Sequence, residues 1–217
     1  MPHVRLPLLP ESARNADPNV PLAPFRDEME AAGSVVIGFG AESIVEVLPS
    51  DHTKVAAHSF RDNPDKRLTY YNHKILHTLF PNHFPVIHAA FEGDHNGMGG
   101  GTIRERIYPQ EPTSQDRVRG LLGRITLRQD KRSFQYVVSE LNSIGIACIV
   151  DPSSWNFMRG RDGYEKYLDT APSIDYEFAE REEELYAYAK KRRYSDEDRR
   201  AIATSMTRLK VLREQKS

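Results

Sequence analysis

The chain has 217 residues, a formal net charge of −1 and 39% hydrophobic residues, enough apolar sequence for a core in one domain or two small lobes. The balanced charge gives no reason to expect a nucleic-acid partner, and no apolar run is long enough to predict a membrane span. The single cysteine, Cys148, excludes an internal disulfide and fits a reducing, cytoplasmic location.

The first half of the chain is predicted to be rich in strands. Residues 1–24 are rich in proline and lack the apolar segment of a signal peptide, so we expect an arm that is extended over the surface or disordered, followed by a short helix over residues 25–32. Two β-rich runs follow between residues 33 and 60. A glycine turn lies within the first, and the polar residues 49–53 separate the two.

One helix interrupts these strands. Apolar residues recur with helical spacing between Arg67 and Leu79. Two further strands are expected between residues 84 and 108, joined by the glycine-rich turn at 96–101. His73 and His77 lie four residues apart on the predicted helix. That spacing suits a zinc pair, but without an H-E-x-x-H frame we expect a packing face.

The second half is predicted to be mostly helical. Helices are expected over residues 112–129 and 133–145, and a small hairpin follows between residues 156 and 169. Two polar helices then close the chain, over residues 176–193 and 195–215. The last begins with a capping box formed by Ser195 and Asp198.

Three oxygen-bearing side chains, Asp151, Asn156 and Asp169, flank the predicted hairpin. Carboxylate and amide oxygens are suitable ligands for Mg²⁺. Phosphoryl transfer uses such a set to hold metal ions and to orient the hydroxyl that is phosphorylated. Asp and Asn also form ordinary turns, so the spacing alone leaves both interpretations open.

The motifs around these residues resemble those of the protein-kinase-like superfamily. GFGAESIV, VAAH and YNHKILHTL are similar to its glycine-rich loop, its lysine-bearing strand and its αC helix. TIRERIYP is similar to the hinge, in the style of bacterial small-molecule and lipopolysaccharide kinases. LNSIGIACIVD, WNFM and RGRDGYEKYLDT resemble the catalytic loop, the Asn-bearing strand and the hairpin that ends in a metal-binding Asp. The resemblance covers about residues 33 to 172.

The resemblance implies the cofactors ATP and Mg²⁺. It makes Asp151 the catalytic residue and makes Asn156 and Asp169 the metal ligands. It also assigns a set of residues to the nucleotide, which share positions in the glycine-rich loop, strand, hinge or hairpin: Gly38, Gly40, Ser43, Val45, Ala56, His58, Glu105, Ile107 and Met158.

Within this set the implied roles differ along the ligand. The glycine-rich loop would bring backbone amides to the phosphates, because glycine leaves room for close approach. Val45 and Ala56 would cover one side of the adenine and Met158 the other. Glu105 and Ile107 would offer hinge backbone groups to the base.

The fold implied is α+β, a two-lobed kinase-like fold with a five-stranded antiparallel sheet in the N-lobe and a reduced helical C-lobe. Residues 1–24 would be the arm, residues 25–108 the N-lobe and residues 109–217 the C-lobe. Only 48 residues follow Asp169. That is too few for the helical lobe that binds peptide substrates in typical protein kinases.

Three positions depart from the family pattern. His58 stands at the position of the strand lysine, Asn72 at that of the αC glutamate, and Thr170 follows Asp169 in place of phenylalanine. Lys54 shares the strand face of His58 but lies roughly 13 Å from it along the strand, too far to replace it.

Two main functional classes therefore remain open. One is an ATP·Mg²⁺-dependent kinase, with protein Ser/Thr hydroxyls as the first acceptor and a sugar or other small molecule as the second. The other is a pseudokinase that binds nucleotide and acts as a scaffold for a protein partner. A plain α+β interaction module is a third, more distant interpretation.

Overall fold

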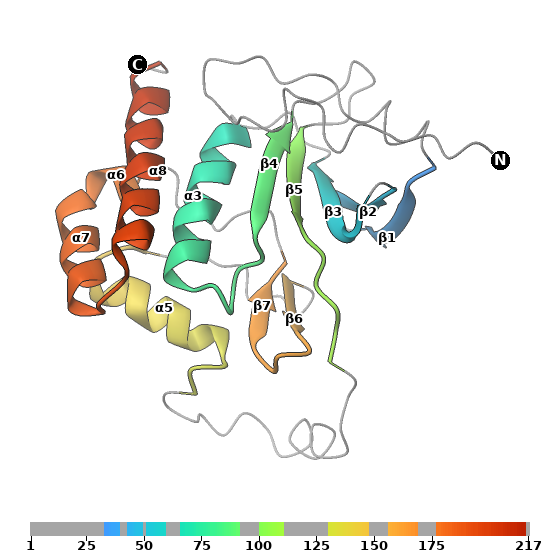
Figure 1. The fold of residues 1–217 in the computed structure, drawn as a ribbon, viewed down its shortest axis with the longest axis horizontal. Coiled ribbons are helices and arrows are strands. Elements are labelled where there is room, and N and C mark those ends of the chain that lie inside the picture. Colours follow the sequence, from blue (N-terminus) through green and yellow to red (C-terminus); the bar gives the residue numbers. More distant parts are fainter. Residues whose placement is uncertain are drawn as a thin grey trace.

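The computed structural model describes residues 33–39, 43–49, 51–59, 66–91, 100–110, 130–147, 156–168 and 177–215. They form an α+β protein in which a five-stranded antiparallel sheet lies beside a group of helices, with a two-stranded hairpin below them (Figure 1). The predicted class and five-stranded sheet are thereby confirmed. The strands are β1 (Val35–Phe39), β2 (Ser43–Leu48), β3 (Asp51–Ser59), β4 (Ile87–Phe91), β5 (Gly101–Glu105), β6 (Phe157–Arg159) and β7 (Glu165–Tyr167).

The order of the strands in the large sheet is β1-β2-β3-β5-β4. Cross-strand partners lie on the same face of a sheet. Val45 on β2 is opposite Ala57 on β3, and Val55 on β3 is opposite Arg104 on β5, so these four side chains share one face. Ala56 belongs to the other face.

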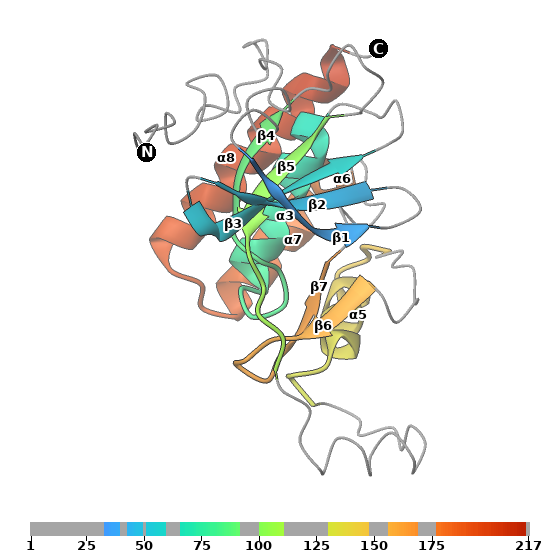
Figure 2. The same ribbon diagram turned by 90° about the vertical axis from the view of Figure 1, so that its right-hand side faces the viewer.

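Helix α3 (Lys66–Leu79) connects β3 to β4 and confirms the helix predicted over residues 67–79. Its expected apolar stripe is buried, with Leu68, Tyr71, Ile75 and Leu79 in the main core. Figures 1 and 2 show α3 between the sheet and α8, the helix Asp196–Glu214. It therefore forms the central layer of the molecule.

The C-terminal helices complete the core on the far side of α3. The apolar residues of α8 are buried, namely Ile202, Met206, Leu209 and Leu212, so this helix is amphipathic and packs against α3. Its capping box of Ser195 and Asp198 is confirmed. The other helices among the described residues are α5 (Phe134–Ser143), α6 (Glu177–Glu180) and α7 (Glu182–Lys191).

The β6–β7 hairpin is fixed to the turn that follows α3. The Tyr167 N–H donates to the carbonyl of His83 over 2.9 Å, and the imidazole Nδ1 of His83 lies 2.7 Å from the carbonyl oxygen of Glu165. Lys166 Nζ donates to the carbonyl of Asn82 over 3.1 Å. Figure 2 shows the hairpin beneath the sheet, where these contacts hold it.

Two sequence predictions need correction. The separator expected over residues 49–53 is shorter, because β3 already begins at Asp51. The single helix expected over residues 176–193 is two helices, which are interrupted at Arg181.

Other predictions concern residues outside those described: the proline-rich arm, the helices over 25–32 and 112–129, and most of the turn at 96–101. Among the helices that the structure describes, none is long and apolar enough to cross a membrane.

Candidate functional site

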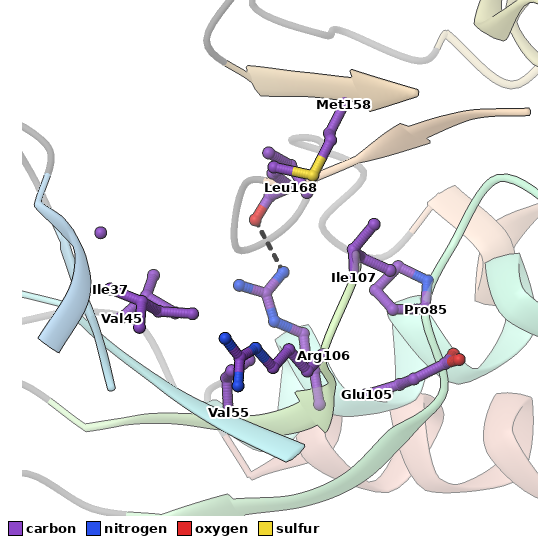
Figure 3. Close-up of a pocket in the computed structure, with 11 residues that line it drawn as sticks. Ile37, Val45, Val55, Pro85, Glu105, Arg106, Ile107, Met158 and Leu168 are labelled. Atoms are coloured by element: carbon purple, nitrogen blue, oxygen red, sulfur yellow. Dashed lines mark hydrogen bonds between the residues drawn. The ribbon is translucent and has the colours of Figure 1, made fainter. Parts of the chain in front are cut away.

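A pocket of about 150 Å³ lies between the sheet and the β6–β7 hairpin. Figure 3 shows side chains from the sheet and from the hairpin converging on the pocket. Its lining is mostly apolar: Ile37, Gly38, Val45, Val55, Pro85, Arg104, Glu105, Arg106, Ile107, Met158 and Leu168.

The register of the strands creates the upper wall of the pocket. Gly38 on β1 is opposite Val45 on β2, and Val55 lies on the same face as Val45. A Cβ at Gly38 would lie 3.5 Å from the Cβ of Val45, an ordinary contact. Glycine is thus not required for packing here, but its missing side chain leaves this part of the wall open.

The hairpin supplies the opposite wall through Met158 and Leu168 (Figure 3). Apolar groups on two sides suit a flat aromatic ring. A cavity of ~150 Å³ accepts one benzene ring. The pocket therefore has room for an aromatic ring.

The segment that follows β5 brings backbone N–H and carbonyl groups to the pocket. The Glu105 N–H donates to the Val86 carbonyl over 2.8 Å, and the Arg106 N–H donates to the Thr53 carbonyl over 2.7 Å. Among the hydrogen bonds that join described residues, none uses the N–H or the carbonyl of Ile107. Ile107 therefore lines the pocket without a backbone hydrogen bond to another described residue.

Five of the residues assigned to the nucleotide from sequence meet in this pocket: Gly38, Val45, Glu105, Ile107 and Met158. Ala56 does not join them. It is fully buried on the opposite face of the sheet with Leu48, Ala89, Phe91 and Ile103, and Val55 takes its place in the pocket wall.

The remaining predicted residues are described in part or not at all. Ser43 and His58 lie in β2 and β3, opposite Ser59 and Ile44 respectively, but their side chains are outside the described part of the structure. Gly40, Asp151 and Asp169 also lie outside it.

Asn156 is the predicted metal ligand that the structure describes. It is partly buried, and its carbonyl accepts a hydrogen bond of 2.8 Å from the N–H of Leu168. Leu168 lines the pocket and immediately precedes Asp169 in the sequence. The described residues contain no cluster of three or more His, Cys, Asp or Glu side chains that would hold a metal ion.

His73 and His77 form the packing face expected of them. The Nε2 of His73 lies 2.9 Å from the Pro85 carbonyl oxygen, and the Nδ1 of His77 lies 2.8 Å from that of Phe84. Burial, and then the charge of Arg104, lower the pKa of His73 to about 3. His73 is therefore neutral and ties α3 to the start of β4.

Arg104 was not singled out from the sequence, although it contributes the buried cation of the pocket. Only 4% of the residue is exposed, and its Nη1 donates to the Leu168 carbonyl over 2.8 Å (Figure 3). The sequence pattern that could have pointed to Arg104 is the polar residues at 102, 104 and 106, which alternate with isoleucine at 103 and 107. That pattern does not say which face is covered.

No protein-family model matches this sequence, and no curated protein has significant similarity to it.

Proposed function

We propose that this protein binds ATP and Mg²⁺ and transfers a phosphoryl group to a hydroxyl acceptor, with protein Ser/Thr side chains as the first choice. The observation that carries the proposal is the convergence of Gly38, Val45, Glu105, Ile107 and Met158 on one ring-sized pocket. These residues come from distant parts of the sequence, and the sequence motifs assigned all of them to the same ligand.

In this proposal the base lies between the two apolar walls of the pocket, and the backbone of Ile107 supplies its hydrogen bonds. Asn156 and Asp169 would hold Mg²⁺ against the phosphates, and Asp151 would orient the acceptor hydroxyl and accept its proton. Positioning and charge stabilisation of this kind account for most of the catalysis of phosphoryl transfer.

Nucleotide binding is tested by calorimetric titration with ATP, in the presence and absence of Mg²⁺, and with adenosine. The wild-type chain should bind ATP·Mg²⁺ and adenosine, whereas Val45→Phe should abolish both because the ring fills the pocket. Val36→Phe is the matched control, since Val36 is 49% exposed on β1 and does not line the pocket. An affinity that is unaffected by Val45→Phe would place the nucleotide elsewhere.

Transfer is tested with γ-labelled ATP on a panel of peptides, sugars and other small hydroxyl compounds, with autophosphorylation scored in parallel. Asp151→Asn should abolish transfer while leaving ATP binding nearly unchanged, because that residue acts on the acceptor. Asp169→Asn should weaken the Mg²⁺ dependence of binding as well. Full transfer by both variants would contradict the proposed roles.

A second candidate function, a nucleotide-binding scaffold without catalysis, is favoured by one observation. On the pocket face of β3 the described side chains are Val55 and Ala57, and Lys54 instead pairs with Asp51 over 2.8 Å. Active kinases use a lysine there to hold the phosphates. ATP binding without transfer to any acceptor, including the chain itself, would support this candidate.

A further inference from the structure

His83, in the turn that follows α3, has an imidazole whose two nitrogens both contact carbonyl oxygens. Only 3% of the residue is exposed. Its Nδ1 lies 2.7 Å from the carbonyl oxygen of Glu165 on β7, and its Nε2 lies 2.9 Å from that of Lys131, in the segment before α5. One side chain therefore connects the turn to the hairpin and to the segment that leads into α5.

These two contacts cannot both be hydrogen bonds of a neutral imidazole. A carbonyl oxygen only accepts, whereas a neutral imidazole has one N–H donor and one acceptor nitrogen. In the neutral form, one ring nitrogen of His83 would turn its lone pair toward the carbonyl oxygen beside it. A ring turned by 180° would place carbon atoms against both oxygens. The doubly protonated form donates to both, so it is the form that satisfies this geometry.

Aromatic rings surround this imidazole and keep water away from it. Three ring centroids lie 5.5, 6.1 and 6.4 Å from its own, those of Tyr164, Phe134 and Tyr136 respectively. Burial, followed by the charge of Glu140, raises the pKa of Tyr136, so that its phenol stays uncharged near pH 7. The two carbonyls are therefore the polar partners of the His83 ring among the described residues.

The charged groups of the elements packed against His83 are engaged elsewhere or face solvent. The Glu165 carboxylate accepts from the Phe134 N–H over 2.8 Å at the start of α5. The Nζ of Lys166 pairs with Asp162 over 2.7 Å. The charged side chains of the segment before α5 are exposed, namely Asp130, Lys131 and Arg132. The protonated ring is therefore favoured by its two carbonyl contacts and not by a neighbouring carboxylate.

The hairpin that His83 contacts forms one wall of the pocket. The Tyr167 N–H donates to the His83 carbonyl over 2.9 Å, and the next residue, Leu168, lines the pocket. Met158, the other hairpin residue in the lining, lies on the strand that pairs with β7. Because Glu165 belongs to β7, a change at the His83 ring reaches this wall through that strand.

We propose that the doubly protonated imidazole of His83 holds the β6–β7 hairpin in position, so that ligand binding in the pocket weakens as the pH rises and the proton is lost. His83 is then a positioning residue, which acts through the hairpin. The inference rests on the proposed function, since it takes adenosine and ATP as the ligands of the pocket. The direction is opposite to that of His73, which is buried in its neutral form and which therefore opposes folding when it takes up a proton.

The protonation of His83 is tested directly by nitrogen NMR of the wild-type chain labelled in its histidine rings. The His83 signals are assigned through their contacts with the rings of Tyr164 and Phe134. At pH 7, where an ordinary histidine is mostly neutral, both ring nitrogens should carry a proton. A short histidine peptide under the same conditions gives the reference. A single protonated nitrogen on His83 at pH 7 would overturn the inference.

The consequence for binding is tested by calorimetric titration with adenosine at pH 6 and pH 8, because adenosine has no phosphate that titrates over this range. The wild type should bind about 10-fold more weakly at pH 8, as expected for loss of a charge-assisted hydrogen bond. His83→Gln has no titrating ring, so its affinities at the two pH values should agree within about 2-fold. His52→Gln is the matched control, because it removes an exposed histidine, and it should keep the wild-type dependence.

The outcomes separate this inference from the proposed function. If the wild type binds neither ATP nor adenosine at either pH, the proposed function fails, and the effect on binding fails with it. If the wild type binds adenosine equally well at both pH values, or if His83→Gln retains the dependence, only the role of His83 is overturned. If His83→Gln does not fold, as judged by circular dichroism, the ring spectrum and the wild-type titration decide.

Discussion

At the scale of single residues, His73 shows how the fold holds a titratable group in its neutral form. The residue is fully buried in α3, and its Nε2 contacts the Pro85 carbonyl. Its pKa is lowered from the ordinary 6.5 to about 3, chiefly by burial. Because the folded state resists protonation and the unfolded state does not, stability must fall as the pH drops below about 6.5.

We predict that His73→Gln reduces the acid sensitivity of the protein. Glutamine can still donate to the Pro85 carbonyl but takes up no proton, so the wild type should lose about 2 kcal/mol more stability than the variant between pH 7 and pH 5. Urea unfolding at both pH values measures this. His52→Gln, at an exposed position, is the control and should follow the wild type. The pKa of His88 is also lowered by burial, but that contribution is present in all three proteins.

Gly101 is a second position where one residue decides local structure. A Cβ there would lie 2.0 Å from the Ala57 carbonyl oxygen and 2.7 Å from the ring of Phe91. The first of these atoms is backbone, so it cannot move without opening the β3–β5 ladder. We predict that Gly101→Ala costs at least about 3 kcal/mol in unfolding free energy.

Gly38→Ala is the matched control for this substitution, because its Cβ would meet Val45 at an ordinary 3.5 Å. It should change the unfolding free energy by less than about 1 kcal/mol. Similar losses in the two variants would show that the close approach at Gly101 is not what constrains the ladder.

The sequence predicted some residues of the pocket and missed others for a physical reason. Gly38, Val45 and Met158 belong to recognisable motifs, and all line the pocket. The choice between Val55 and Ala56 depends on which face β3 turns inward, and a run of small apolar residues carries no period that would decide it. Arg104 was missed for the same reason, because an arginine in a strand normally indicates the exposed face.

At the scale of elements, α8 is an amphipathic helix that is stabilised at both its start and its buried face. The Ser195 hydroxyl accepts from the Asp198 N–H over 3.1 Å, and the Asp198 carboxylate accepts from the Ser195 N–H over 3.2 Å. The capping box was visible in the sequence because its signal is local. The sequence predicted a polar helix and not its buried apolar face, because the charged residues between the apolar ones dominate the composition of the helix.

We predict that Ser195→Ala destabilises the whole protein by about 1 kcal/mol, because the first turn of α8 loses its cap. The measurement is equilibrium urea unfolding followed by circular dichroism. Thr207→Ala, an exposed substitution within the same helix, is the control and should change stability by no more than about 0.5 kcal/mol. Equal losses in both variants would show that the cap is not the source of the effect.

The break between α6 and α7 is not predicted by any local sequence pattern. Arg181 has φ −107° and ψ 35°, outside the helical range, although arginine and its neighbours are good helix formers. Phe178 and Leu185, on either side of the break, are both completely buried. Tertiary packing therefore overrides the helical propensity of this segment.

At the scale of the whole molecule, the pocket lies between the large sheet and the β6–β7 hairpin. These two parts are otherwise connected through the turn after α3. The Arg104–Leu168 hydrogen bond spans the pocket, and the contacts of His83 and Asn82 hold the hairpin from behind. The α+β class and the position of the helix between β3 and β4 followed from periodicity. How the hairpin docks could not, because it depends on side-chain to carbonyl contacts between residues about 80 positions apart.

We predict that ATP·Mg²⁺ at a free concentration of 100 times its Kd stabilises the protein by ~2.7 kcal/mol, provided that it binds the folded state alone. Hydrogen exchange should slow in both walls, at β1–β2 and at β6–β7, because the ligand contacts both. Chemical unfolding and exchange measured by mass spectrometry check these effects. Protection confined to α7 and α8, or full stabilisation of Val45→Phe, would contradict binding in this pocket.

The two walls of the pocket also differ in when they are made. Ile37 and Val45 leave the ribosome first, and Met158 and Leu168 follow more than a hundred residues later. A nascent chain can therefore form the strands of one pocket wall before the hairpin of the opposite wall has been synthesised. The pocket itself is complete only once the segment that carries Met158 and Leu168 has been translated.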